Sequence, residues 1–105
     1  MKEQIQTIAE HYGYDNQSRQ LIEEMSELTV AINKYWRKIL FCGKKKIENV
    51  EFPMPEESNV IEEIADVEIM LEQMKLFFAC HEEVEAWKKE KIKRQMGRIN
   101  RNESY

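Results

Sequence analysis

The sequence predicts an all-α fold, and three observations lead to this prediction. Apolar residues recur at helical spacing over long stretches, and no stretch of useful length alternates in the manner of a strand. Three glycines and two prolines leave little material for a sheet with many turns. Charged residues make up 34% of the chain, as suits helices with one solvated face. With 105 residues, the chain is expected to form a single domain, or one protomer of an assembly.

Two helices are expected in the first part of the chain. The first covers about residues 2–12 and ends at Gly13, because glycine readily adopts the conformation that follows a helix C-terminus. Asp15 or Asn16 then caps a long second helix that reaches about Leu40.

A loop over residues 43–58 is predicted to separate these helices from the rest of the chain, because it contains Gly43, Pro53 and Pro55. Asn59 and Glu62 have the spacing of a capping box for a third helix. This helix is expected over about residues 60–80 and a fourth over about 82–97, followed by a frayed tail at 100–105.

Composition excludes several classes of function. The net charge of −4 argues against binding of a nucleic acid polymer, which needs clustered basic residues. Cys42 and Cys80 lack the spacing of a zinc site and are interpreted as reduced thiols. No signal peptide is recognised, and no apolar run approaches the roughly 18 residues of a membrane span. We therefore expect a cytoplasmic protein that does not associate with membranes.

Two segments share one acidic pattern. Residues 22–28 and 61–67 each read isoleucine, two glutamates, an apolar residue, a small residue, an acid and an apolar residue. Each segment lies in a predicted helix and places two acids three residues apart, as Glu24 with Glu27 and Glu63 with Asp66.

Helical geometry places these acids in an unusual position. At about 100° per residue, Glu24 and Glu63 fall within the apolar stripes of their helices, with Glu27 and Asp66 at the edges. Measured from Glu24 or Glu63, most other stripe residues lie at about 20° to 100°. On the opposite side of these glutamates, Ala31 lies near −20° on the second helix, and Met70 and Phe77 lie near −20° and −40° on the third. The residues at 20° to 100° are as follows. In the second helix they are Leu21, Met25, Leu28, Ile32, Tyr35 and Ile39, and in the third they are Val60, Ile64, Val67, Leu71, Met74 and Phe78.

Four converging carboxylates would repel one another and are costly to bury without a cation. Few basic residues are placed to help, since Lys34 and Lys38 only flank the first acid pair. A bound divalent metal resolves both problems, and ligands that are all oxygen favour Mg²⁺ or Mn²⁺. The alternative is that both segments are exposed acidic patches on ordinary amphipathic helices.

The pair of motifs, Glu24-Met-Ser-Glu27 and Glu63-Ile-Ala-Asp66, resembles the ExxE…ExxD signature of MazG-like nucleotide pyrophosphohydrolases. The resemblance covers most of the chain. It implies a four-helix arrangement completed by homo-oligomerisation, as a homodimer or homotetramer. It also implies Mg²⁺-dependent cleavage of a nucleoside triphosphate between the α and β phosphates, giving the monophosphate and pyrophosphate. Glu24, Glu27, Glu63 and Asp66 are then the metal ligands and catalytic residues, and Glu23 is a weaker candidate for positioning water.

The chain departs from the family pattern at two places. The stretch over residues 28–62, between the two motifs, is longer than is usual in the family, with the excess in the predicted loop. Many relatives carry a lysine followed four residues later by asparagine in the last helix, and here Lys91 is followed by Gln95.

Candidate substrate contacts lie outside the acidic motifs. Lys91, Gln95 and Arg98 share the inward side of the last helix, where they could contact phosphate, or the charged side chains could extend to water instead. Trp36 could stack on a base or pack in a core or dimer interface. Lys44–Lys46 could close over phosphates or remain in a solvated loop.

Two alternative functions remain open. One is a related enzyme with the same metal motif, either phosphoribosyl-ATP pyrophosphohydrolase or a dUTP- or dCTP-specific member. The other is a non-catalytic helical module that oligomerises or binds a partner. Nothing in the sequence identifies the base.

Overall fold

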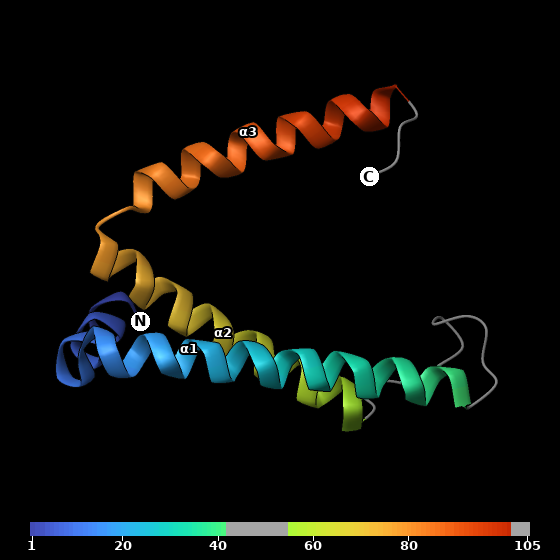
Figure 1. The fold of residues 1–105 in the computed structure, drawn as a ribbon, viewed down its shortest axis with the longest axis horizontal. Coiled ribbons are helices and arrows are strands. Elements are labelled where there is room, and N and C mark those ends of the chain that lie inside the picture. The colour runs from blue at the N-terminus through green and yellow to red at the C-terminus, as the bar shows by residue number, and fades with distance from the viewer. Residues whose placement is uncertain (42–54, 102–105) are drawn as a thin grey trace.

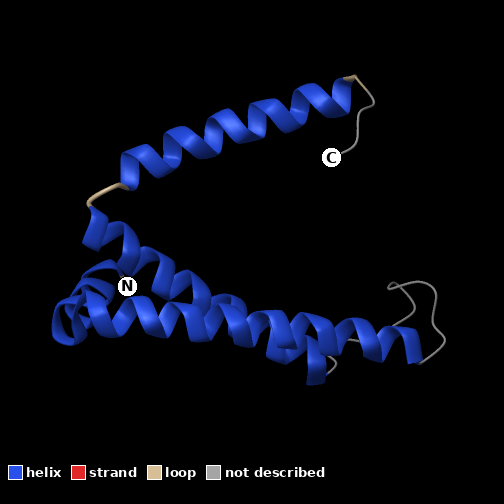
Figure 2. Ribbon diagram, in the orientation of Figure 1, coloured by secondary structure: helices blue, strands red, loops and turns tan. Residues whose placement is uncertain are grey.

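The computed structural model describes residues 1–41 and 55–101, and within these ranges the fold is all-α. Helix α1 covers Lys2–Phe41, α2 covers Pro55–Phe78 and α3 covers His81–Asn100, and the described residues include no strand (Figures 1 and 2). The predicted positions Cys42, Gly43, Lys44–Lys46 and Pro53, and residues 102–105 of the predicted tail, lie outside the described residues.

Helix α1 is interrupted at Gly13, where the sequence predicts the end of a first helix. Gly13 has φ 82° and ψ 165°, a conformation that residues with a Cβ atom rarely adopt. The side-chain amide of Asn16 donates a hydrogen bond to the Tyr12 carbonyl at 2.9 Å. Asn16 therefore bonds back toward the preceding turn, although it was one of two predicted N-terminal caps.

Helix α2 begins earlier than the sequence predicts. The sequence predicts a loop over residues 55–58, but the helix starts at Pro55. Asn59 and Glu62 therefore lie inside the helix and form no capping box at its start. Proline is favoured at the first helical position because its φ is already helical and its missing N–H would be unpaired there. Glu56 and Glu57 follow in the first turn, where negative charge is favourable.

The turn between α2 and α3 ends α2 without a glycine. Ala79 has φ 50°, the left-handed conformation that usually follows a helix C-terminus. The Ala79 amide donates to the Leu76 carbonyl at 3.2 Å and the Cys80 amide donates to the Lys75 carbonyl at 3.1 Å. These two bonds form a Schellman motif, which satisfies the last carbonyl groups of α2.

Helices α1 and α2 form an antiparallel hairpin, and most of the packing between the described helices lies between these two (Figure 1). Its buried apolar side chains come from both helices and are Ala9, Ala31, Ile39, Val67 and Met70. Tyr14, next to the break in α1, meets the rings of Phe77 and Phe78 edge-on, each with 5.6 Å between ring centroids. The hairpin therefore contains the core of the described chain.

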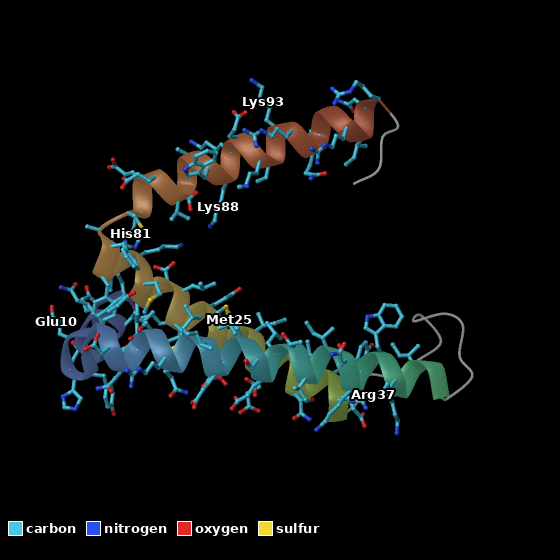
Figure 3. All side chains as sticks on the ribbon, viewed as in Figure 1. Glu10, Met25, Arg37, His81, Lys88 and Lys93 are labelled. Atoms are coloured by element: carbon cyan, nitrogen blue, oxygen red, sulfur yellow. The ribbon has the colours of Figure 1, made fainter. Side chains whose placement is uncertain are left out.

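Helix α3 leaves the end of α2 and diverges from the hairpin (Figure 1), with slight contact to α2 and no buried residue. The radius of gyration is 17.7 Å, whereas a compact domain of this length has about 13 Å. Lys88 points from α3 toward the side where the hairpin lies, and Lys93 points away from it (Figure 3). None of the described helices is long and apolar enough to cross a membrane.

Candidate metal centre

The two acidic motifs lie where α1 and α2 face each other. Glu24 and Glu27 are one turn apart on α1, and Glu63 and Asp66 are one turn apart on α2. Because the helices run in opposite directions, the first acid of one motif faces the second acid of the other. Two regular helices are therefore enough to bring the acids together, without any contribution from a loop.

Three of the four predicted ligands form a close cluster, which we call the acidic triad: Glu24, Glu63 and Asp66. One carboxylate oxygen from each lies within 4.8 Å of the others, and all three side chains are partly buried. Glu24 Oε1 accepts a hydrogen bond from Gln20 Nε2 at 2.8 Å. Glu24 Oε2 and Glu63 Oε2 are buried and have no hydrogen-bond partner among the described residues.

Glu27, the fourth predicted ligand, lies beside the acidic triad but outside it. Its side chain is exposed, and it lines a hollow in the surface together with Glu63. Its pKa is raised, mainly by the negative charge of Glu24 and further by partial desolvation. Glu23, also exposed, adds to this repulsion.

The surroundings of Glu63 and Asp66 disfavour the charged forms of these two carboxyl groups. Desolvation is the main cause that raises the pKa of Glu63, followed by the charges of Glu27 and Asp66. Desolvation also raises the pKa of Asp66, followed by the charges of Glu24 and Glu62. Bringing these acids together is therefore unfavourable at neutral pH unless a cation offsets the repulsion.

No protein cation neutralises the triad within residues 1–41 and 55–101. Lys38 lies 3.9 Å from Glu56, nearer the start of α2, and so is paired elsewhere. Lys75 pairs with Glu72 at 2.9 Å, and this hydrogen bond lowers the pKa of Glu72. Lys34 lines the hollow beside Glu27 and Glu63 but forms no ion pair with a described residue.

The candidate substrate contacts do not join the acidic triad within one chain. Lys91, Gln95 and Arg98 lie on α3, which diverges from the hairpin, and Lys91 Nζ lies 5.8 Å from the centroid of the Trp87 ring. Trp36 lies on α1 and is 57% exposed.

The sequence predicts no role in the site for two polar side chains of this region. Gln20 donates to Glu24, and Lys34 faces the hollow. Spacing contained a signal for both residues. Gln20 precedes Glu24 by four residues and Lys34 follows Glu27 by seven, so each shares a helix face with an acid of the first motif.

The structure therefore places two carboxylates of α1 opposite two of α2, and one oxygen atom from each of three of them lies within 4.8 Å of the others. Such an arrangement of oxygen atoms can coordinate a hard divalent cation. Comparisons of the chain with protein-family models, with curated proteins and with solved structures find no match.

Proposed function

We propose that the chain is a Mg²⁺-dependent nucleotide pyrophosphohydrolase. It cleaves a ribo- or deoxyribonucleoside triphosphate between the α and β phosphates, giving the monophosphate and pyrophosphate. The observation that supports this proposal is the acidic triad, in which oxygens of Glu24, Glu63 and Asp66 from two helices approach within 4.8 Å. The resemblance of the two motifs to the MazG-like signature supplies the reaction.

The chemistry of the triad fits a hard divalent cation. All its ligand atoms are carboxylate oxygens, which Mg²⁺ and Mn²⁺ prefer, whereas zinc and copper favour nitrogen and sulfur ligands. One carboxylate oxygen of Glu24 and one of Glu63 are buried without a hydrogen-bond partner among the described residues. When bound, the metal neutralises charge on the phosphates and lowers the pKa of a coordinated water.

The residues of this chain then have separate roles. Glu24, Glu63 and Asp66 hold the metal. Glu27, exposed at the edge of the triad, completes the ligand set or positions the attacking water. The bond from Gln20 to Glu24 Oε1 orients that carboxylate and leaves its other oxygen for the metal.

We further propose that a second copy of the chain covers the hairpin. Part of each predicted apolar stripe is buried, but the part at about 80° to 100° from Glu24 or Glu63 is exposed on both helices. In a pair of antiparallel helices, residues at the same angle from these two glutamates lie on the same face of the hairpin. The exposed residues of this apolar face are Met25, Ile32, Ile64 and Leu71. Pairing two such faces produces a four-helix arrangement, as a homodimer or homotetramer.

Assembly also gives α3 a role. Helix α3, which carries Lys91, Gln95 and Arg98, diverges from the hairpin that holds the acidic triad of the same chain (Figure 1). We therefore assign the phosphate contacts of these three residues to the site of another copy. Trp36, which is largely exposed, is the candidate for stacking on the base. The narrower alternatives, phosphoribosyl-ATP or dUTP and dCTP as substrate, share this metal site and differ in the base or sugar.

A nucleotide panel with Mg²⁺, scored by release of pyrophosphate, tests the proposal. We expect pyrophosphate from at least one nucleoside triphosphate, and none after EDTA is added. Including phosphoribosyl-ATP, dUTP and dCTP separates the narrower alternatives. A non-catalytic oligomerisation module would release no pyrophosphate from any of them.

A further inference from the structure

A hollow of about 330 Å³ lies beside the acidic triad, where α1 and α2 face each other. Its volume is at the lower end of the roughly 300–1,000 Å³ of small-molecule sites. The polar side chains that line it come from both helices and are Ser26, Glu27, Lys34, Asn59 and Glu63. Glu63 belongs to the acidic triad, so the hollow and the candidate metal centre are continuous.

Two lysines one turn apart on α1 differ in their partners. Lys38 lies 3.9 Å from Glu56. Lys34 is exposed and lines the hollow, and its ammonium forms no ion pair with any residue in the described parts of the chain. The hydroxyl of Ser26 is already used, since it donates to the Ile22 carbonyl at 3.0 Å. Among the described residues that line the hollow, Lys34 is therefore the only cation, and none of them occupies its hydrogen-bond donors in an ion pair.

Charge determines which ligand the hollow accepts. A polyphosphate would be repelled by Glu27 and Glu63 unless cations lie on both sides of it. A metal on the acidic triad supplies one of these cations, and Lys34 supplies the other. Lysine binds phosphate as a compact point charge with three donors. Asn59, on the facing helix, offers an uncharged amide to the same ligand.

We propose that Lys34 binds a phosphate group of the metal-bound polyphosphate, within the hollow between α1 and α2. This inference rests on the proposed function and adds a substrate contact from the same hairpin that holds the metal. The contact from Lys34 does not depend on Lys91, Gln95 and Arg98, which lie on α3.

The test compares Lys34→Met with Lys38→Met in the full chain. Both changes remove one positive charge from the same helix and keep an unbranched apolar stem. The probe is inorganic tripolyphosphate with excess Mg²⁺, measured by calorimetry, because it carries the phosphates without a base or sugar. We expect Lys34→Met to weaken the binding of tripolyphosphate about tenfold, because it removes one charge-assisted hydrogen bond. Lys38→Met should change the affinity for tripolyphosphate less than twofold.

Two further measurements complete the test. Both variants should keep the rise in melting temperature produced by Mn²⁺, which shows that the hairpin and the acidic triad are intact. In hydrolysis, Lys34→Met should mainly raise KM, because the contact exists before the reaction.

Equal binding of tripolyphosphate by Lys34→Met and the unchanged protein would overturn the inference, as would no binding by the unchanged protein. If the unchanged protein binds tripolyphosphate through Lys34 but cleaves no nucleotide, the proposed reaction fails and the phosphate site stands. If it cleaves nucleotides and Lys34→Met behaves as Lys38→Met does, the reaction stands and the phosphate site fails.

Discussion

Gln17 on α1 donates a hydrogen bond from Nε2 to Oε1 of Gln73 on α2, at 2.8 Å, and both side chains are buried. Gln73 is only 1% exposed, and its own Nε2 donates to the sulfur of Met70 at 3.5 Å. Two turns further along α1, and two turns back along α2, the same register places Glu24 opposite Asp66. The glutamine pair therefore fixes the alignment that brings the acidic motifs together.

Removing one partner of this pair should destabilise the hairpin. Gln73→Leu leaves the buried amide of Gln17 without its acceptor, so we expect the free energy of unfolding to fall by about 1–3 kcal/mol. Urea unfolding followed by circular dichroism measures this change. The double variant with Gln17→Leu and Gln73→Leu should recover part of the loss, because neither buried amide then remains unpaired. A double variant as unstable as the sum of the two single ones would contradict this account.

Metal binding should stabilise the folded protein. The triad carboxylates converge in the fold and not in the unfolded chain, so Mg²⁺ or Mn²⁺ should raise the melting temperature. At a hundredfold excess over the dissociation constant, the gain is about 2.7 kcal/mol. Glu63→Gln should remove most of the response, whereas Glu62→Gln, on the solvated side of α2, should keep it. A melting curve that millimolar Mg²⁺ leaves unchanged would refute the metal site.

Without metal, the acidic cluster should make stability depend on pH. The raised pKa values of Glu27, Glu63 and Asp66 mean that these groups bind protons more readily in the folded state than in the unfolded chain. Their contribution is fully present below the ordinary values of 4.5 and 3.8 and is lost as pH rises through the raised values. Glu72, whose pKa is lowered, acts in the opposite sense, and its contribution is lost as pH falls below about 4.5.

Urea unfolding in EDTA at about pH 7 and about pH 5.5 measures this dependence. Over this interval we expect the unchanged protein to be more stable at the lower pH, and Glu63→Gln to reduce the difference. A Glu63→Gln protein with the same pH dependence as the unchanged one would show that the repulsion does not act through this group.

Oligomerisation should depend on the apolar face of the hairpin. Leu71 belongs to this face and is 43% exposed, while Ile69, two residues away, is 40% exposed on the other side of α2. Leu71→Glu should therefore produce a monomer, and the matched control Ile69→Glu should keep the assembly of the unchanged protein. Light scattering at micromolar concentration distinguishes these states. A monomeric unchanged protein would contradict the prediction of an assembly.

Helical periodicity predicted the helices, and the glycine itself predicted the break at Gly13, because both signals are local. The start of α2 was predicted wrongly, because Pro55 can end a loop or begin a helix, and a sequence pattern does not distinguish the two roles. The turn at Ala79 could not be predicted, because alanine rarely adopts a positive φ and gives no turn signal.

The acidic triad was predictable for a similar reason. Glu63 and Asp66 share a face of one helix, and the repeated motif indicates which helix they meet. The sequence places Lys34 beside the first acid pair but does not predict its position in the hollow, which depends on how α2 lies against α1. The path of α3 could not be derived either, since none of its residues is buried and it makes only slight contact with α2.

The most direct test of the central claim is the rate of pyrophosphate release by Asp66→Asn. This change keeps the size of the side chain and removes one charge from the acidic triad, while Glu68→Gln removes a charge from an exposed position two residues away. With a nucleoside triphosphate cleaved by the unchanged protein, we expect Asp66→Asn to lower the rate by about two orders of magnitude or more. Glu68→Gln should retain the rate. A fully active Asp66→Asn protein, or inorganic phosphate in place of pyrophosphate as the first product, would contradict the account.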